Sequence, residues 1–275
     1  MHAPNQISLA AKASGEPEFR EIGLGPWSET HPGEPRPDDP TSSNYDGRFD
    51  SVLLNDGDRR NVLDRYRYWT VAAIKADLDA RGRHDFEVAV ENWTHDFNIG
   101  SMVRTANAFQ AKRVHIVGPH KWNRKGALMT ELYQHVELVE SWHHHIAGEI
   151  AYERAKAGAA AIHAHDVAVD GDNKHLHELL AEIDACDARI KELQAARVIA
   201  LDIIPGAVPM EAYAFPKRCL LLFGAEGPGL SEKALALADD VVYISQFGSV
   251  RSINAGAAAA VAMHAWIAQH AVSGV

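Results

Sequence analysis

From residue 86 onward the chain alternates short apolar runs with longer amphipathic ones. Most of the short runs are apolar at consecutive positions, which is typical of parallel strands that are covered on both faces. They are FEVAVEN (86–92), RVHIVG (113–118), AAAIHAHD (159–166), RVIALDII (197–204), CLLLFG (219–224) and VVYIS (241–245). Helical periodicity separates them, at 98–110, 146–157, 172–195, 229–238 and 252–270. The alternation predicts an open α/β domain that binds ligands at the carboxyl ends of its strands.

The N-terminal part of the chain lacks this alternation. Residues 1–50 are rich in Pro, Gly, Ser and Glu, which predicts an acidic, disordered tail. Within 51–85, apolar residues recur every three or four positions from 59 to 82, which predicts a helical extension. Its other side interleaves arginines with aromatic residues, a combination that suits phosphate contact and base stacking, although a helix packed on the domain is the simpler interpretation. These arginines are Arg59, Arg60, Arg65 and Arg67.

Charge is distributed unevenly along the chain, whose net charge is −10. Residues 1–50 and 166–196 each carry −5, so the remainder is neutral, and we interpret 166–196 as an acidic helical insertion. The segment 97–130 contains no acid, which makes it a candidate phosphate-facing surface. A solvated face paired with acids elsewhere remains the alternative. The basic residues in question are Lys112, Arg113, Lys121, Arg124 and Lys125.

Several classes of protein are excluded or disfavoured. No run of eighteen apolar residues is present, so we expect no membrane-spanning helix, and the N-terminus does not resemble a signal peptide. Two cysteines, Cys186 and Cys219, indicate reduced thiols in a cytoplasmic protein. The WHHH sequence at 142–145 lacks a second group of ligands, so we interpret it as a solvated turn and expect no metal site.

Three segments carry candidate chemistry. In the first, Asn98 is placed to cap a helix and Arg104 follows about two turns later. In the second, Glu226 lies inside a glycine turn whose spacing is not that of a dinucleotide-binding loop, which disfavours a nicotinamide-dependent enzyme without excluding it. In the third, Ser252 and Asn254 precede an alanine-rich helix, and either residue could cap that helix or face a pocket. This last helix is apolar nearly all round, so we expect it to be buried on most sides or in a subunit interface.

Together, NIGSMVRTA (98–106), FGAEGPGLS (223–231) and ISQFGSVRSIN (244–254) resemble the three motifs of the SpoU/TrmH branch of the SPOUT superfamily. The likeness covers about residues 86–165 and 197–270. It implies a parallel α/β sheet with a C-terminal deep trefoil knot, a homodimer, and S-adenosylmethionine-dependent methylation of a ribose 2'-hydroxyl in RNA. The residues that match as catalytic are Arg104, Asn98, Glu226, Ser252 and Asn254. Those that match as cofactor-binding are Leu222, Phe223, Gly224, Ile244, Gln246, Ser249 and Ile253.

The chain also departs from the family pattern. Ser245 stands where the family usually has proline, and Ala255-Gly256 stands where it usually has Val-Ser, which alters the shape of the expected pocket. No added N-terminal RNA-binding domain is recognisable, which favours tRNA over rRNA as the substrate. A catalytically silent RNA-binding relative remains the alternative hypothesis.

Overall fold

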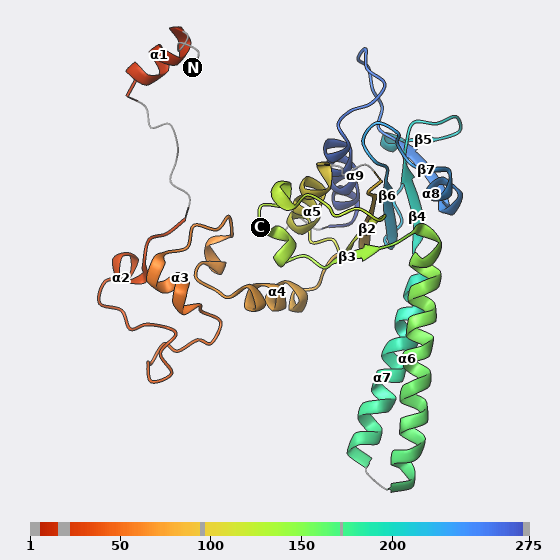
Figure 1. Ribbon diagram of the computed structural model, residues 1–275, viewed down its shortest axis with the longest axis horizontal. Helices are drawn as coiled ribbons and strands as arrows, with labels where there is room; N and C mark the ends of the chain where they lie inside the picture. Colours follow the sequence, from red (N-terminus) through yellow and green to blue (C-terminus); the bar gives the residue numbers. More distant parts are fainter. Residues whose placement is uncertain (1–5, 16–22, 94–96, 171–172, 272–275) are drawn as a thin grey trace. The chain divides into compact units, whose positions relative to one another are not determined.

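A computed structural model describes residues 6–15, 23–93, 97–170 and 173–271 (Figure 1). The chain divides into two compact units, Met1–Ile74 and Lys75–Val275. Among its described residues, the first unit wholly contains four helical segments, and a further helix, α4 (Val71–Ala80), begins there. The four are α1 (Gln6–Ala13), α2 (Trp27–Thr30), α3 (Ser51–Asp56) and the 3-10 turn η1 (Asp64–Tyr66).

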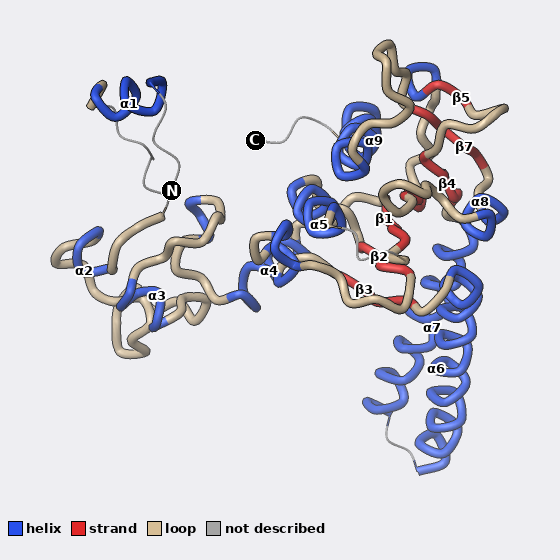
Figure 2. The backbone as a smooth tube through the Cα atoms, turned by 45° about the horizontal axis from the view of Figure 1, so that its top comes forward, coloured by secondary structure: helices blue, strands red, loops and turns tan. Residues whose placement is uncertain are grey.

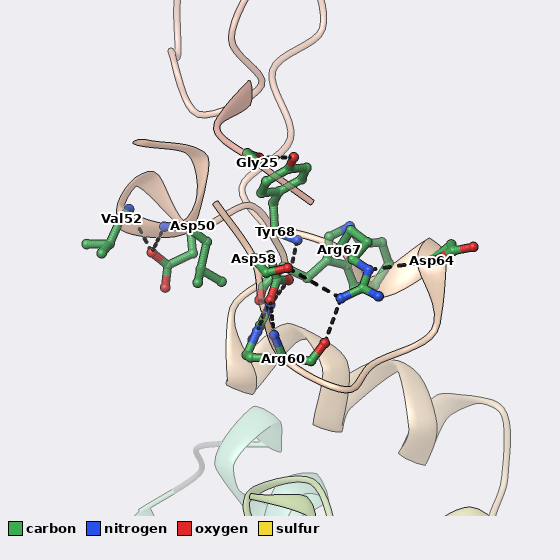
Figure 3. A network of polar contacts seen from close by, with 10 residues as sticks. Gly25, Asp50, Val52, Asp58, Arg60, Asp64, Arg67 and Tyr68 are labelled. Carbon is green, nitrogen blue, oxygen red and sulfur yellow. Dashed lines mark hydrogen bonds and ion pairs between the residues drawn. The ribbon is translucent and has the colours of Figure 1, made fainter. Parts of the chain in front are cut away.

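A buried carboxylate and an apolar cluster hold the first unit together. Figure 3 shows the polar contacts around that carboxylate, Asp58. Asp58 is fully buried, forms an ion pair with Arg60 at 2.7 Å, and accepts the backbone N–H of Tyr68 at 2.9 Å. Trp27 packs with Leu54 and Tyr68 in one apolar cluster. A carboxylate that is buried away from water is stable only when it is paired and hydrogen-bonded. The bonds to Arg60 and Tyr68 therefore fix the loop between α3 and α4.

Two sequence predictions for this unit are wrong. Residues 24–50 do not form a disordered tail, because Trp27 is buried and the segment pairs through Leu24 with Asp58. The predicted helix over 59–82 begins only at Val71. Tyr68 has a φ of 62°, in the left-handed region that a right-handed helix cannot contain, so the helix starts after it.

The second unit contains a seven-stranded sheet in which all neighbouring strands are parallel, as predicted. The strand order is β3-β2-β1-β6-β4-β7-β5. Because β6 pairs with both β1 and β4, the carboxyl ends of strands far apart in sequence lie at one edge. The strands are β1 (Phe86–Glu91), β2 (Val114–Val117), β3 (Val136–Val139), β4 (Arg197–Leu201), β5 (Val208–Pro209), β6 (Cys219–Phe223) and β7 (Asp240–Tyr243).

Helices cover both faces of the sheet (Figure 2). Phe86 and Val88 of β1 point into the core that contains residues of α5 (Asn98–Ala108) and α9 (Ala255–His270), whereas Ala89 points to the opposite core with α8 (Glu232–Leu237). This two-sided burial is the reason that the strands are continuously apolar in sequence. Three 3-10 turns complete the unit: η2 (Arg124–Ala127), η3 (Thr130–Leu132) and η4 (Met210–Ala212).

A long helical hairpin extends from the sheet where a strand was expected (Figure 1). Its helices are α6 (Trp142–Asp170) and α7 (Asn173–Ala195), so the run at 159–166 is helical and the acidic insertion begins earlier than residue 166. Ala160 and Ala164 pack against Leu179 between the two helices. Alanine has the highest helix propensity, and here it outweighs the apolar run that was taken as a strand.

Two strands and one burial pattern also differ from expectation. The strands β3 and β5 were not predicted, because Leu138 of β3 is 70% exposed and β5 has only two residues. Helix α9 buries one face, including Ala259 and Trp266, but leaves Val261 43% exposed. Within the described ranges, no helix is long and apolar enough to cross a membrane.

Candidate active site

Side chains from the three sequence motifs meet at the carboxyl edge of the sheet. Asn98, the first residue of α5, donates a hydrogen bond from Nδ2 to Glu226 Oε2 of the glycine turn. Asn254 donates from Nδ2 to Asn98 Oδ1 at 2.8 Å, and its own Oδ1 accepts the N–H of Ala257 at 3.1 Å. We call Asn98, Glu226 and Asn254 the polar triad. Asn254 therefore caps α9 and faces the site, whereas Asn98 does not cap α5, whose N-cap residue is Phe97.

Gly256 allows α9 to approach the polar triad closely. A Cβ atom at this glycine would lie 3.2 Å from Asn254 Oδ1 and 3.4 Å from Asn98 Oδ1. Both contacts are tighter than usual, so a larger residue would displace one of the two amides. The departure from the family pattern at 255–256 thus makes room for the triad.

The glycine turn between β6 and α8 has a closed shape that requires its glycines. A Cβ atom on Gly224 would lie 2.1 Å from the carbonyl carbon of Gly229, and Ala225 O accepts the Gly229 N–H at 3.1 Å. Gly227 and Gly229 have φ values of 93° and 75°, which favour glycine. The turn consequently presents Glu226 toward Asn98 in a fixed geometry.

Two acidic residues that were not predicted from the sequence accept hydrogen bonds from the end of this turn. Glu91, fully buried at the end of β1, accepts Ser231 Oγ–H at 2.6 Å through Oε1 and Ser231 N–H at 2.8 Å through Oε2. Asp202, just after β4, accepts the N–H of Leu230 at 3.4 Å. Glu91 ends an apolar strand and Asp202 directly follows one, at the edge of the sheet where ligands bind in this class of fold. An acidic residue at the end of an apolar strand is the sequence pattern that could have identified both.

The predicted cofactor-binding residues fall into two groups. Leu222 and Phe223 are buried in the two cores of the sheet, so only their backbone could contact a ligand. Gln246 follows β7 in the loop that leads to α9, and its Oε1 is buried without a hydrogen-bond partner in the described part of the chain. A buried amide oxygen without a partner indicates a missing donor. Gly224 and Ile244 lie half-buried, and Ser249 and Ile253 are exposed in the loop.

Arg104 and Ser252 lie apart from the hydrogen bonds of the polar triad. Arg104 is exposed on α5, six residues after Asn98 and therefore about 9 Å further along the helix axis. Ser252 is exposed in the loop before α9. The arginine is thus presented to solvent beside the site, where it can contact a large substrate.

The basic residues predicted to bind RNA have different surroundings. Arg60 is held by Asp58, and Arg67 donates to the carbonyl oxygens of Arg60 at 2.6 Å and Asp58 at 3.5 Å, so the structure assigns both to the interior of the first unit (Figure 3). Arg113 forms an ion pair with Glu137 at 2.7 Å. Lys112 is half-buried. The exposed members of the set are Arg59, Arg65, Lys121, Arg124 and Lys125.

No group of three His, Cys, Asp or Glu side chains that could hold a metal ion occurs among the described residues. The histidines of the 142–145 sequence lie in α6, and their side chains are outside the described part.

The fold is an open parallel α/β sheet, and the polar triad lies at the carboxyl edge of that sheet, where such folds bind ligands. Residues 154–264 match the SpoU rRNA Methylase family. The matched range contains Glu226 and Asn254 but not Asn98 or Arg104.

Curated relatives are tRNA (guanosine(18)-2'-O)-methyltransferases. The chain is 24% identical to the Escherichia coli K12 protein over 188 residues, which is 68% of this chain and 65% of that protein. It is 31% identical to the Saccharomyces cerevisiae protein over 107 residues, 38% of this chain and 8% of that protein. Among solved structures, the SpoU methyltransferase AviRb from Streptomyces viridochromogenes in complex with AdoMet has a TM-score of 0.48 at 24% identity, covering 70% of this chain and 64% of that chain. The chain therefore spans less than two thirds of these relatives.

Proposed function

We propose that the protein is a methyltransferase that transfers the methyl group of S-adenosylmethionine to the 2'-hydroxyl of a ribose in structured RNA, with tRNA favoured over rRNA. The observation that carries this proposal is the convergence of the polar triad from three separate motifs. The match of residues 154–264 to the SpoU rRNA Methylase family and the names of the curated relatives agree with this chemistry. We place the methyltransferase domain at residues 86–275, which lie within the unit Lys75–Val275.

The residues around the loop after β7 fit the proposed cofactor. Gln246 has a buried oxygen that lacks a donor. The glycine turn, which resembles the family's second motif, offers backbone N–H and carbonyl groups. S-adenosylmethionine, when bound, supplies an electrophilic methyl group on a positively charged sulfur. Gly224, Ile244 and Ile253 would hold it through backbone atoms.

The reaction requires the ribose hydroxyl to lose a proton as its oxygen forms the new bond to carbon. Glu226 is the carboxylate of the polar triad and can accept that proton, while Asn98 fixes its orientation through the hydrogen bond to Oε2. Arg104 clamps the phosphate of the target nucleotide and polarises the attacking oxygen. A guanidinium stays protonated at neutral pH, so it acts through its charge and its two-pronged hydrogen bonding rather than as a base.

The distance between Arg104 and the polar triad is the reason that we propose a homodimer. Because Arg104 projects into solvent about 9 Å along α5 from Asn98, it would serve the site of a second copy in a homodimer. The exposed Val261 of α9, next to α5, lies on the face that would form the interface. We also propose that the loop after β7 and α9 form the trefoil knot of the family, and that the protein acts in the cytoplasm, where tRNA is found.

The test of this proposal is titration calorimetry with S-adenosylmethionine and its demethylated product. We expect both ligands to bind the wild-type protein without added metal and to bind Asn254→Ala at least ten-fold more weakly. Absence of binding to folded protein would contradict the proposed cofactor. Binding of RNA without methyl transfer would instead support a silent RNA-binding relative. Comparing 2'-O-methyl positions in total RNA with and without the gene then identifies the substrate.

A further inference from the structure

A strained, exposed, apolar turn lies between η2 and η3. Leu128 has φ 48° and ψ 48°, and Met129 has φ 69° and ψ 1°, so both residues are left-handed, close to a type I′ turn. Asn and Gly are the residues that favour this turn. Within the described ranges, this is the only adjacent pair of non-glycine residues with positive φ. Yet Leu128 is 54% exposed and Met129 is 50% exposed, so burial in the core does not explain their identity.

The residues that flank this turn hold it in place. Ala127 is fully buried against α5, and Thr130 is buried and donates its hydroxyl to Ala127 O at 2.6 Å. With both ends anchored, the backbone between them is forced outward, and the Leu128 and Met129 side chains are presented to solvent. Backbone strain that persists because the surroundings impose it is a frequent sign of a functional site.

The turn lies beside the polar triad and within the basic segment. A Cβ atom on Gly100 would lie 2.8 Å from Ala127 N and 2.9 Å from Asn123 O, so the segment leading into the turn packs on the first turn of α5, which also carries Asn98. Its exposed neighbours in sequence are Lys121, Arg124 and Lys125, and no acid occurs from 97 to 130. Positive charge thus precedes the apolar pair in sequence, and the half-buried Glu131 follows it.

We propose that Leu128 and Met129 form an apolar wedge that packs against an unstacked base next to the ribose that is methylated, an inference that rests on the proposed RNA substrate. Sequence-specific RNA recognition favours bases that are splayed out of the helix, and apolar side chains inserted between bases hold nucleic acids open. Lys121, Arg124 and Lys125 contact the neighbouring phosphates. RNA fits this surface better than a second copy of the chain, because a two-fold contact would bring the same positive charges together.

The test replaces the pair by the residues that the turn prefers. In Leu128→Asn/Met129→Gly the backbone keeps its shape with less strain, so we expect Tm to rise by a few degrees and S-adenosylmethionine affinity to stay unchanged. We expect kcat/KM for tRNA methylation and the affinity for tRNA each to fall about ten-fold, equivalent to about 1.4 kcal/mol. A purely structural role cannot produce higher stability together with weaker substrate binding. The matched control is Gln110→Gly, which relieves another left-handed residue (φ 49°) and should leave both RNA measurements unchanged.

Two results would overturn the wedge. Unchanged kcat/KM and tRNA affinity in the double variant would show that the turn does not contact RNA, and dissociation of a dimer would show that a second copy covers it. Failure of the proposed function is separate from either. If the wild-type protein transfers no methyl group, fluorescence anisotropy with labelled tRNA still compares the two proteins, and equal affinities would again overturn the wedge.

Discussion

Replacing Glu91 by glutamine tests whether a buried carboxylate beneath the glycine turn supports the site. Glu91 is fully buried, and its Oε1 accepts Ser231 Oγ–H and the indole N–H of Trp93, at 2.6 and 2.9 Å. Its Oε2 accepts Ser231 N–H at 2.8 Å. Glutamine can keep the two bonds to Oε1, but its amide group then points a donor at the Ser231 N–H. Loss of one hydrogen bond to a charged group, with a buried donor left unpaired, lowers the free energy of unfolding by about 1.5–3 kcal/mol.

The consequence for ligand binding follows from where Ser231 lies. Ser231 is the N-cap of α8 and ends the glycine turn that carries Glu226, so movement of Ser231 changes the position of Glu226. We expect Glu91→Gln to weaken S-adenosylmethionine binding about ten-fold. Ser231→Ala, the comparison variant, keeps the backbone N–H bond to Oε2 but loses the cap, worth about 1 kcal/mol, and the hydroxyl bond to Glu91, worth about 1.5–3 kcal/mol.

Urea unfolding measures the stability of both variants, and calorimetry measures their ligand affinity. A Glu91→Gln protein within about 0.5 kcal/mol of wild type, the range of ordinary surface substitutions, would refute the reasoning. Lower stability with unchanged ligand affinity would show that Glu91 supports the fold but does not position the turn.

Three further predictions concern other buried or exposed charges. Burial lowers the pKa of His115, but the hydrogen bonds of His115 to Glu137 and Glu87 outweigh burial and raise this pKa above 6.5. The stabilising contribution of His115 is therefore complete below about pH 6.5 and is lost as pH rises through the raised pKa. Burial opposes the charge of Glu87, yet His115 lowers the pKa of Glu87 to about 2, so the stabilising contribution of Glu87 is present above about pH 4.5 and is lost as pH falls toward 2. Urea unfolding from pH 2 to 9 measures both losses of stability, at low and at high pH. His115→Gln should abolish the loss at high pH and lower the free energy of unfolding by about 3–5 kcal/mol. Asp58→Asn should destabilise the first unit by about 3–5 kcal/mol, because the charge of its partner Arg60 would lose its counter-charge in a mostly buried site. Limited proteolysis should then cleave within residues 23–74. Arg104→Lys should lose most methyl transfer while S-adenosylmethionine affinity is unchanged, as measured by single-turnover kinetics and calorimetry, because an ammonium cannot make the two-pronged phosphate contact.

Much of the second unit could be predicted from the sequence, because its strands are buried on both faces and their apolar runs are unbroken. The strand from Val136 could not, since Leu138 is exposed and the apolar run is interrupted by Glu137. The run at 159–166 was mistaken for a strand because periodicity cannot separate a short apolar run from part of a helix whose partner is unknown. That partner is α7, which contacts it through Leu179.

Site residues could be predicted when they lie in one of the three sequence motifs. They could not be predicted when tertiary packing determines what the side chain contacts. Asn98, Glu226 and Asn254 were identified in sequence, and the structure joins them by hydrogen bonds. Arg60 could not be separated from a surface arginine, because its partner Asp58 becomes buried only when Trp27 and Tyr68 pack in the same unit. The same packing explains why residues 24–50 are folded despite their polar composition.

The most direct test of the proposed activity is transfer of a tritiated methyl group from S-adenosylmethionine to purified tRNA and rRNA, followed by mapping of the modified nucleotide. The wild-type protein should label one ribose 2'-oxygen in tRNA. Arg104→Ala should bind S-adenosylmethionine normally and transfer no label. A wild-type protein that binds the cofactor but labels neither RNA, or an Arg104→Ala protein with full activity, would contradict the account.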